Sequence, residues 1–217
     1  MKPLDHAHET FRSCIWRSTD SLASWSFDGY EGVPATVEVY SASPTVDILL
    51  NGQKVGRVKT GPQNKWMSTI KVPYAAGTLT AIAYDQGGSE TGRSSLHSAT
   101  ADIRLKASPE SYEMTANGQD SIAIPIEIVD QAGTLHVLKD RLVSISVEGT
   151  SATVAGFGTA RPVTSALFTD WKVVSYYGRA MAVLRASLQP GEVNITFAAD
   201  GLEDETVRIM VHPSAKS

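Results

Sequence analysis

The histidines are the first residues whose chemistry can be weighed from the sequence. His6 and His8 are two residues apart, so on a helix they would point in different directions, and no third metal ligand stands nearby. His97, His136 and His212 stand alone in predicted loops or strand ends, where we expect surface side chains. The sequence therefore predicts no metal centre and no bound cofactor.

Nucleophilic and calcium-binding arrangements are also weakly supported. No Gly-x-Ser-x-Gly elbow accompanies the many serines. Four aspartates stand near strand ends without an Asp-x-Asp-x-Asp-Gly loop, so they are interpreted as turn residues rather than calcium ligands. These aspartates are Asp102, Asp120, Asp130 and Asp140. Glu203 and Glu205 share a strand face, which indicates a solvated acidic edge more than a pair of glycosidase carboxylates.

An aromatic, glycine-bounded segment is the most informative candidate. Trp25, Phe27 and Tyr30 lie within eight residues that end at Glu31 and Gly32. Exposed aromatic faces stack on sugars, and a neighbouring acid accepts hydrogen bonds from sugar hydroxyls. The sequence thus offers Trp25, Tyr30 and Glu31 as a carbohydrate contact. The alternative is that Trp25 and Phe27 fill a core while Tyr30 caps an edge.

The composition of the chain indicates which classes of protein it can belong to. The 217 residues are 42% hydrophobic and 19% charged with a net charge of −4, which is typical of a folded domain and gives no basic surface for nucleic acid. No apolar run is long enough for a membrane-spanning helix, and the first residues do not form a signal peptide. One cysteine, Cys14, excludes an internal disulfide.

Period-2 alternation predicts strands through most of the chain. Two alternating runs flank Asn51-Gly52, the strongest short signature of a hairpin, so residues 46–58 are expected to form one. Further strands are predicted at 37–40, 78–84, 122–128, 143–147, 180–184, 193–197 and 207–211. Turns at regular spacing favour sandwiches over βαβ units. The expected fold class is all-β, with two tandem immunoglobulin-like β-sandwich domains after a short N-terminal helical or irregular segment.

Domain boundaries follow from composition. A polar Gly/Ser-rich stretch over 87–98 and Ser108-Pro109 indicate a division near residue 107, giving domains at 21–107 and 108–217. Residues 1–20 carry one weak apolar stripe, with Phe11 and Ile15 at i and i+4, too short to fold alone. We expect this segment to dock on a partner.

Several motifs stand in a fixed order in the first half of the chain: residues 24–32, 37–41, 46–56, 72–74 and 77–84. Together they resemble the sandwich domain that follows the catalytic barrel in bacterial family 2 glycoside hydrolases of the β-galactosidase type. In the second half, residues 115–120, 129–133, 177–185 and 201–202 resemble the immunoglobulin-like C-terminal domain of the same enzymes. Residues 1–20 resemble the chain that leaves the barrel.

The resemblance implies a retaining parent enzyme with two catalytic glutamates on a (β/α)8 barrel. Neither glutamate has a counterpart here, so no catalytic residue is assigned and the chain alone is not expected to be an enzyme. Its implied role is a non-catalytic C-terminal accessory fragment that supports the barrel in cis and contributes to substrate access. Two alternatives stay open: a carbohydrate-binding module, and invasin-like adhesion or spacer repeats. Oligomeric state and compartment stay open as well.

Overall fold

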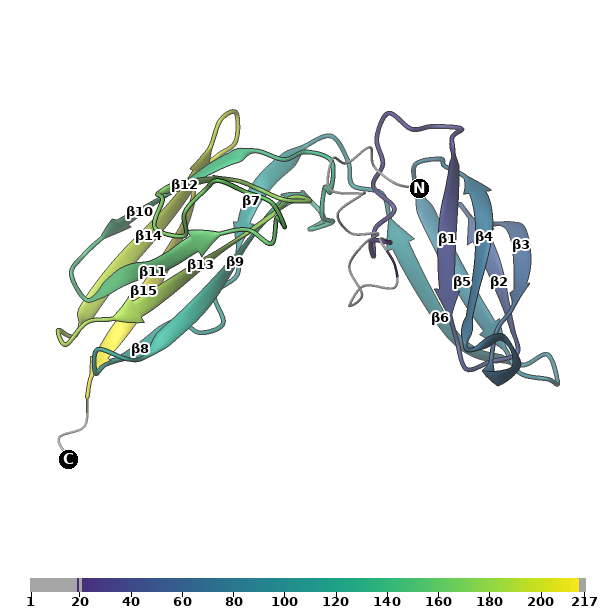
Figure 1. Ribbon diagram of the computed structural model, residues 1–217, viewed down its shortest axis with the longest axis horizontal. Helices are drawn as coiled ribbons and strands as arrows, with labels where there is room; N and C mark the ends of the chain where they lie inside the picture. The colour runs from purple at the N-terminus through teal and green to yellow at the C-terminus, as the bar shows by residue number, and fades with distance from the viewer. Residues whose placement is uncertain (1–18, 20, 215–217) are drawn as a thin grey trace. The chain divides into compact units, whose positions relative to one another are not determined.

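The computed structural model describes Thr19 and residues 21–214, and it is built almost entirely of strands (Figure 1). The chain divides into two compact units, one ending at Ala99 and the next beginning at Thr100. The predicted all-β fold with packed sheets is confirmed. The predicted N-terminal helical segment, with Phe11 and Ile15, lies outside the described residues. No helix within the described part of the chain is long and apolar enough to cross a membrane.

The described residues of the first unit form six strands and one 3-10 turn. They are β1 (Pro34–Tyr40), β2 (Thr45–Leu50), β3 (Gln53–Lys59), η1 (Pro62–Asn64), β4 (Met67–Pro73), β5 (Thr78–Tyr84) and β6 (Glu90–His97). β1 and β4 form a two-stranded antiparallel sheet, and the other four strands form a sheet in the order β3-β2-β5-β6. Within the described residues, β1 and β6 each have one edge without a partner strand.

The predicted hairpin around Asn51-Gly52 is confirmed. β2 pairs antiparallel with β3, and both turn residues have positive φ, 51° and 79°, as a type I′ turn requires. The Asn51 side chain also ties this turn to the next strand: its Oδ1 accepts a hydrogen bond from the Thr78 backbone N–H at 2.8 Å. Asn51 therefore both forms the turn and binds the first residue of β5.

Residues 87–98, the polar stretch that indicated a domain division, lie mostly within a strand of the first unit. Residues 90–97 form β6, which pairs with β5 along its length. The strand is polar because it is a sheet edge whose side chains are mostly exposed, so it lacks the buried alternation that marks other strands. Polar composition alone therefore did not distinguish an edge strand from a connection.

Up to residue 214, the second unit forms nine strands in two sheets. They are β7 (Ile103–Ala107), β8 (Glu113–Ala116), β9 (Ser121–Asp130), β10 (Leu142–Glu148), β11 (Ala152–Gly158), β12 (Lys172–Val174), β13 (Arg179–Ala186), β14 (Gly191–Ala199) and β15 (Glu205–Pro213). One sheet has the order β12-β10-β14-β15-β8, with β8 parallel to β15, and the other has the order β11-β13-β9-β7. β7 pairs with β9, so this unit begins before the predicted boundary at residue 107.

The core of the second unit follows from the strand periodicity. Ile122, Ile124, Ile126 and Ile128 of β9 are all at most 5% exposed, as their spacing predicts, and they belong to one cluster of buried apolar residues. The cluster takes side chains from both sheets, including Phe157 of one and Phe197 of the other, whose ring centroids are 6.4 Å apart. The two sheets thus bury one continuous apolar layer.

Candidate functional site

The aromatic segment before β1 supplies core residues. Trp25 and Phe27 are 2% and 4% exposed, and both rings contact Tyr74, with centroid distances of 5.2 and 5.8 Å. The Trp25 indole N–H donates to the Ala75 carbonyl at 3.0 Å, and the Tyr74 hydroxyl accepts the Phe27 backbone N–H at 3.1 Å. A ring held in this way has no free face for a sugar. The placement of Trp25 and Phe27 matches the core interpretation.

Tyr30 and Glu31 lie apart from that aromatic cluster. Tyr30 is half-buried in a turn in which its backbone N–H donates to the Phe27 carbonyl at 3.1 Å, and Glu31 is exposed. The structure therefore does not place Trp25, Tyr30 and Glu31 on one binding surface. The carbohydrate contact at Trp25, Tyr30 and Glu31 stays a prediction, which calorimetric titration with galactosides would test.

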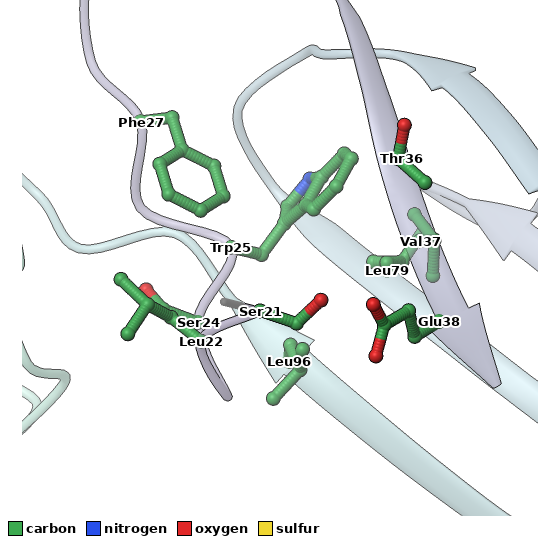
Figure 2. Close-up of a pocket in the computed structure, with 10 residues that line it drawn as sticks. All are labelled: Ser21, Leu22, Ser24, Trp25, Phe27, Thr36, Val37, Glu38, Leu79 and Leu96. Carbon is green, nitrogen blue, oxygen red and sulfur yellow. The ribbon is translucent and has the colours of Figure 1, made fainter. Parts of the chain in front are cut away.

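A small hollow of about 80 Å³ lies beside the aromatic segment (Figure 2). Trp25, Val37, Leu79 and Leu96 give it apolar walls, and Glu38 of β1 supplies a carboxylate. Figure 2 shows the Ser21 hydroxyl turned toward Glu38. Glu38 is not predicted as a site residue from the sequence, because a single acid on a strand forms no motif.

The Glu38 carboxylate is held by hydroxyl groups. The Thr19 hydroxyl donates to Glu38 Oε1 at 2.6 Å, and the Tyr40 hydroxyl donates to Oε2 at 2.8 Å. Partial burial raises the pKa of Glu38, but hydrogen bonds from Thr19, Tyr40 and Ser21 outweigh this effect and bring the pKa below its ordinary value. An ionised carboxylate of this kind anchors the chain segment at Thr19 and is a poor proton donor.

A second charged group lies on the four-stranded sheet of the first unit. Asp47, 6% exposed, accepts hydrogen bonds from Arg57, including one from Nη2 at 2.9 Å, and from Lys54 Nζ at 2.8 Å. The hydrogen bonds from Arg57 lower the pKa of Asp47 to about 2 against the opposing effect of burial, with help from Lys54. The Arg57 guanidinium lies 5.5 Å from the Tyr84 ring centroid. The group is a cross-strand ion pair that stabilises the sheet.

Three of the four aspartates considered as calcium ligands, Asp120, Asp130 and Asp140, bind backbone groups instead. Asp130 accepts the N–H groups of Thr134 and Thr100 at 2.8 and 2.9 Å, and Asp120 accepts that of Thr115 at 2.6 Å. Burial raises the pKa of Asp130, but these backbone hydrogen bonds lower it further than burial raises it. Such contacts are ordinary turn chemistry.

Asp140 behaves in the same way. Its Oδ1 accepts the Gly178 backbone N–H at 2.9 Å and the Ser175 hydroxyl at 3.0 Å. Across the described residues, no three His, Cys, Asp or Glu side chains lie close enough to hold a metal ion. His6 and His8 lie outside that part of the chain.

One histidine prediction is wrong. His97 and His212 are exposed as expected, but His136 is only 1% exposed. The loop after β9 folds back so that the His136 backbone N–H donates to the Ile128 carbonyl at 2.9 Å. A Cβ on Gly178 would lie 2.7 Å from the His136 carbonyl oxygen, which shows how closely the two loops approach. The local sequence gives no sign of this long-range packing.

The second unit also exposes large apolar side chains that the sequence pattern does not predict. Val163, Leu167, Phe168 and Trp171 are 56–72% exposed in the connection between β11 and β12. The Phe168 ring covers Gly158, where an added Cβ would lie 2.4 Å from it. Exposed apolar groups gathered in one connection are typical of contact surfaces.

Comparison with known families accounts for both units. Residues 105–208 match the model described as glycoside hydrolase family 2 C-terminal domain 5. Residues 32–92 match a domain of unknown function, DUF4982.

Individual enzymes of this family are also similar to the chain in sequence and in structure. A β-galactosidase of Bacteroides ovatus is 26% identical to this chain over 170 residues, which are 78% of this chain and 20% of the relative. A putative β-glucuronidase of Formosa agariphila is 28% identical over 172 residues, which are 78% of this chain and 16% of the relative. A crystal structure of a family 2 member from Bacteroides cellulosilyticus superimposes with a TM-score of 0.82 at 32% identity, covering 88% of this chain and 24% of that one.

The chain thus spans about a fifth of the length of the curated relatives that it matches. The similarity to these relatives extends through both units, and the family 2 C-terminal domain model matches most of the second unit. The chain belongs to the C-terminal domains of glycoside hydrolase family 2.

Proposed function

We propose that this chain is the non-catalytic C-terminal part of a retaining family 2 glycosidase, where its sandwiches support the catalytic barrel in cis. The observation that carries the proposal is the asymmetry of coverage: relatives match 78% of this chain but only 16–20% of their own length. The remaining length in such relatives leaves ample room for a catalytic barrel, which in this fold class takes about 250 residues.

The relatives are a β-galactosidase and a putative β-glucuronidase, so the substrate class of the parent is a β-linked glycoside. Which sugar it accepts would be decided by the barrel, because active sites of such barrels are formed by loops at the carboxyl ends of their strands. The exposed apolar side chains of Phe168 and Trp171 are a surface on which the barrel could rest.

Two assays test the proposal. The pure chain should not hydrolyse nitrophenyl β-galactoside or β-glucuronide; a rate proportional to its concentration in independent preparations would contradict the non-catalytic role. In the Bacteroides ovatus relative, removing the matching region should lower the melting temperature of the barrel, and replacing that region with this chain should restore it. A truncated enzyme as stable as the intact one would refute the supporting role.

A further inference from the structure

The tripeptide Asn-Gly-Gln occurs twice in the chain, at residues 51–53 and 117–119. Asn-Gly is a chemically reactive pair: the backbone nitrogen of the glycine attacks the side-chain Cγ of the asparagine, and glycine has no Cβ to hinder the approach. Both asparagines are exposed to water, so solvent access does not distinguish them. Because the two copies share one local sequence, a difference in their reactivity has to come from the tertiary structure.

The first copy is held away from this reaction. Asn51 has φ at 51° in the β2–β3 turn, and its side chain binds residues 76–78. Its Nδ2 donates to the Ala76 carbonyl at 3.0 Å, and its Oδ1 accepts the Thr78 backbone N–H at 2.8 Å. A Cβ added to Gly77 would overlap Asn51 Oδ1, so the amide is closely packed as well as bonded. Cyclisation requires both of these hydrogen bonds to break.

The second copy is held in a geometry that favours the reaction. Asn117 lies in the turn between β8 and β9, and its Oδ1 accepts the backbone N–H groups of Gln119 and Asp120 at 2.9 and 2.7 Å. The bond from Gln119 closes an Asx turn, which folds the side-chain amide back along the Gly118 peptide. The Gly118 N–H donates only a long hydrogen bond, 3.3 Å, to the Ser187 carbonyl. The attacking nitrogen is therefore close to the amide and weakly restrained.

The two donors also activate the amide of Asn117. When the Gly118 nitrogen attacks Cγ, negative charge develops on Oδ1, the atom to which Gln119 and Asp120 already donate. Hydrogen-bond donors fixed where charge develops stabilise such a transition state, as in an oxyanion hole. At Asn51, by contrast, the leaving Nδ2 group is itself hydrogen-bonded to the protein.

We propose that Asn117 is a site of spontaneous deamidation and that Asn51 is protected from it. The Gly118 nitrogen loses its proton to water and forms a bond to Cγ. The Cγ–Nδ2 bond breaks, and Nδ2 leaves as ammonia after taking a proton from water. Water then opens the succinimide ring: breaking the Cγ–N bond gives aspartate, and breaking the bond between the backbone carbonyl carbon and nitrogen gives isoaspartate. The proposal is independent of the proposed glycosidase parent.

The modification alters a turn that connects three strands. Asp120 accepts the Thr115 N–H of β8 at 2.6 Å, and its carbonyl accepts the Ala186 N–H at the end of β13 at 2.8 Å. Aspartate at position 117 adds a second carboxylate beside Asp120, and isoaspartate lengthens the main chain by one methylene group. β8 is the last strand of its sheet, so we expect it to lose protection first.

Mass spectrometry of the full chain tests the site. During incubation at mildly alkaline pH, the peptide that contains Asn117 should convert from amide to acid about tenfold faster than the peptide that contains Asn51. Releasing one hydrogen bond of ordinary strength costs about that factor in rate. In concentrated urea, where only the shared local sequence remains, the two rates should become similar. Equal rates in the folded chain, a faster rate at Asn51, no conversion at either site, or a difference that persists in urea would overturn the proposal.

A variant tests the consequence. Asn117→Gln should stay unmodified at this position, because the longer side chain cyclises slowly. On incubation, the unsubstituted chain should show faster hydrogen exchange in the β8 peptide, whereas Asn117→Gln should keep the exchange rate of the fresh protein. The matched variant Asn51→Gln should still convert at Asn117 and lose protection in β8. Equal loss of protection in the unsubstituted chain and in Asn117→Gln would show that deamidation is not its cause.

Discussion

The two units build a β-sandwich core in different ways. In the second unit, two sheets of five and four strands cover one continuous cluster of buried apolar residues. In the first unit, one sheet has only two strands, and an irregular segment fills part of the space that further strands would cover, with Trp25 and Phe27 packed on Tyr74. The difference shows that three packed aromatic rings, those of Trp25, Phe27 and Tyr74, can supply part of a sandwich core where one sheet has only two strands.

Truncating the central ring of the first unit should have the largest effect. Trp25→Ala removes two ring contacts and the hydrogen bond to Ala75, so we expect a loss of about 3–5 kcal/mol in the free energy of unfolding. Trp66→Ala, at a residue 55% exposed, should change it by less than about 0.5 kcal/mol. Denaturant titration with hydrogen exchange would assign the loss to the first unit. Equal effects of the two substitutions would show that the ring cluster does not support this unit.

A pair of glycines tests the tight loop packing of the second unit. Gly178 and Gly201 both have positive φ, 72° and 77°, but only at Gly178 would a Cβ meet backbone, 2.7 Å from the His136 carbonyl oxygen. We expect Gly178→Ala to cost about 3 kcal/mol and Gly201→Ala about 1 kcal/mol. Thermal unfolding of both variants measures the difference. Similar costs would mean that the two loops move apart easily.

The ion pair on the first unit predicts a pH dependence of its stability. The pKa of Asp47 is lowered to about 2 from 3.8, so its stabilising effect is fully present above about pH 4 and is lost as pH falls through 2. Asp47→Asn should cost about 1.5 kcal/mol at pH 7, reduced by the partial exposure of Lys54 and Arg57, and well under half of that at pH 2, where about half of the Asp47 carboxyl groups in the folded protein are protonated. Urea titrations of both proteins across this range test this. A constant difference would show that charge is not the cause.

The smallest effect is expected in the exposed connection of the second unit. Val163 is 72% exposed, so Val163→Ser should change the free energy of unfolding by less than about 0.5 kcal/mol. Val143→Ser, at a fully buried position of β10, provides the contrast and should be far more destabilising. Chemical denaturation of both variants gives the comparison. A large loss for Val163→Ser would mean that this connection packs against the unit more closely than its exposure indicates.

The sequence by itself determined the strands whose side chains alternate between core and solvent. Ile122 to Ile128 and the hairpin at Asn51-Gly52 were predictable because periodicity and turn conformation are local properties. For the aromatic segment at Trp25 and Phe27, the sequence allowed either a core or a binding surface. It could not decide between them, because the burial of a ring depends on the distant residues that cover it.

Only the tertiary structure decided the remaining features. It identified residues 90–97 as an edge strand, placed His136 in the interior and formed a groove of about 410 Å³ lined by residues of β1, β2, β5 and β6. Each of these depends on contacts between distant segments, whereas periodicity and turn propensity report only on neighbours. An edge strand with mostly exposed side chains and a groove lined by several strands leave no periodic pattern that a linear reading can detect.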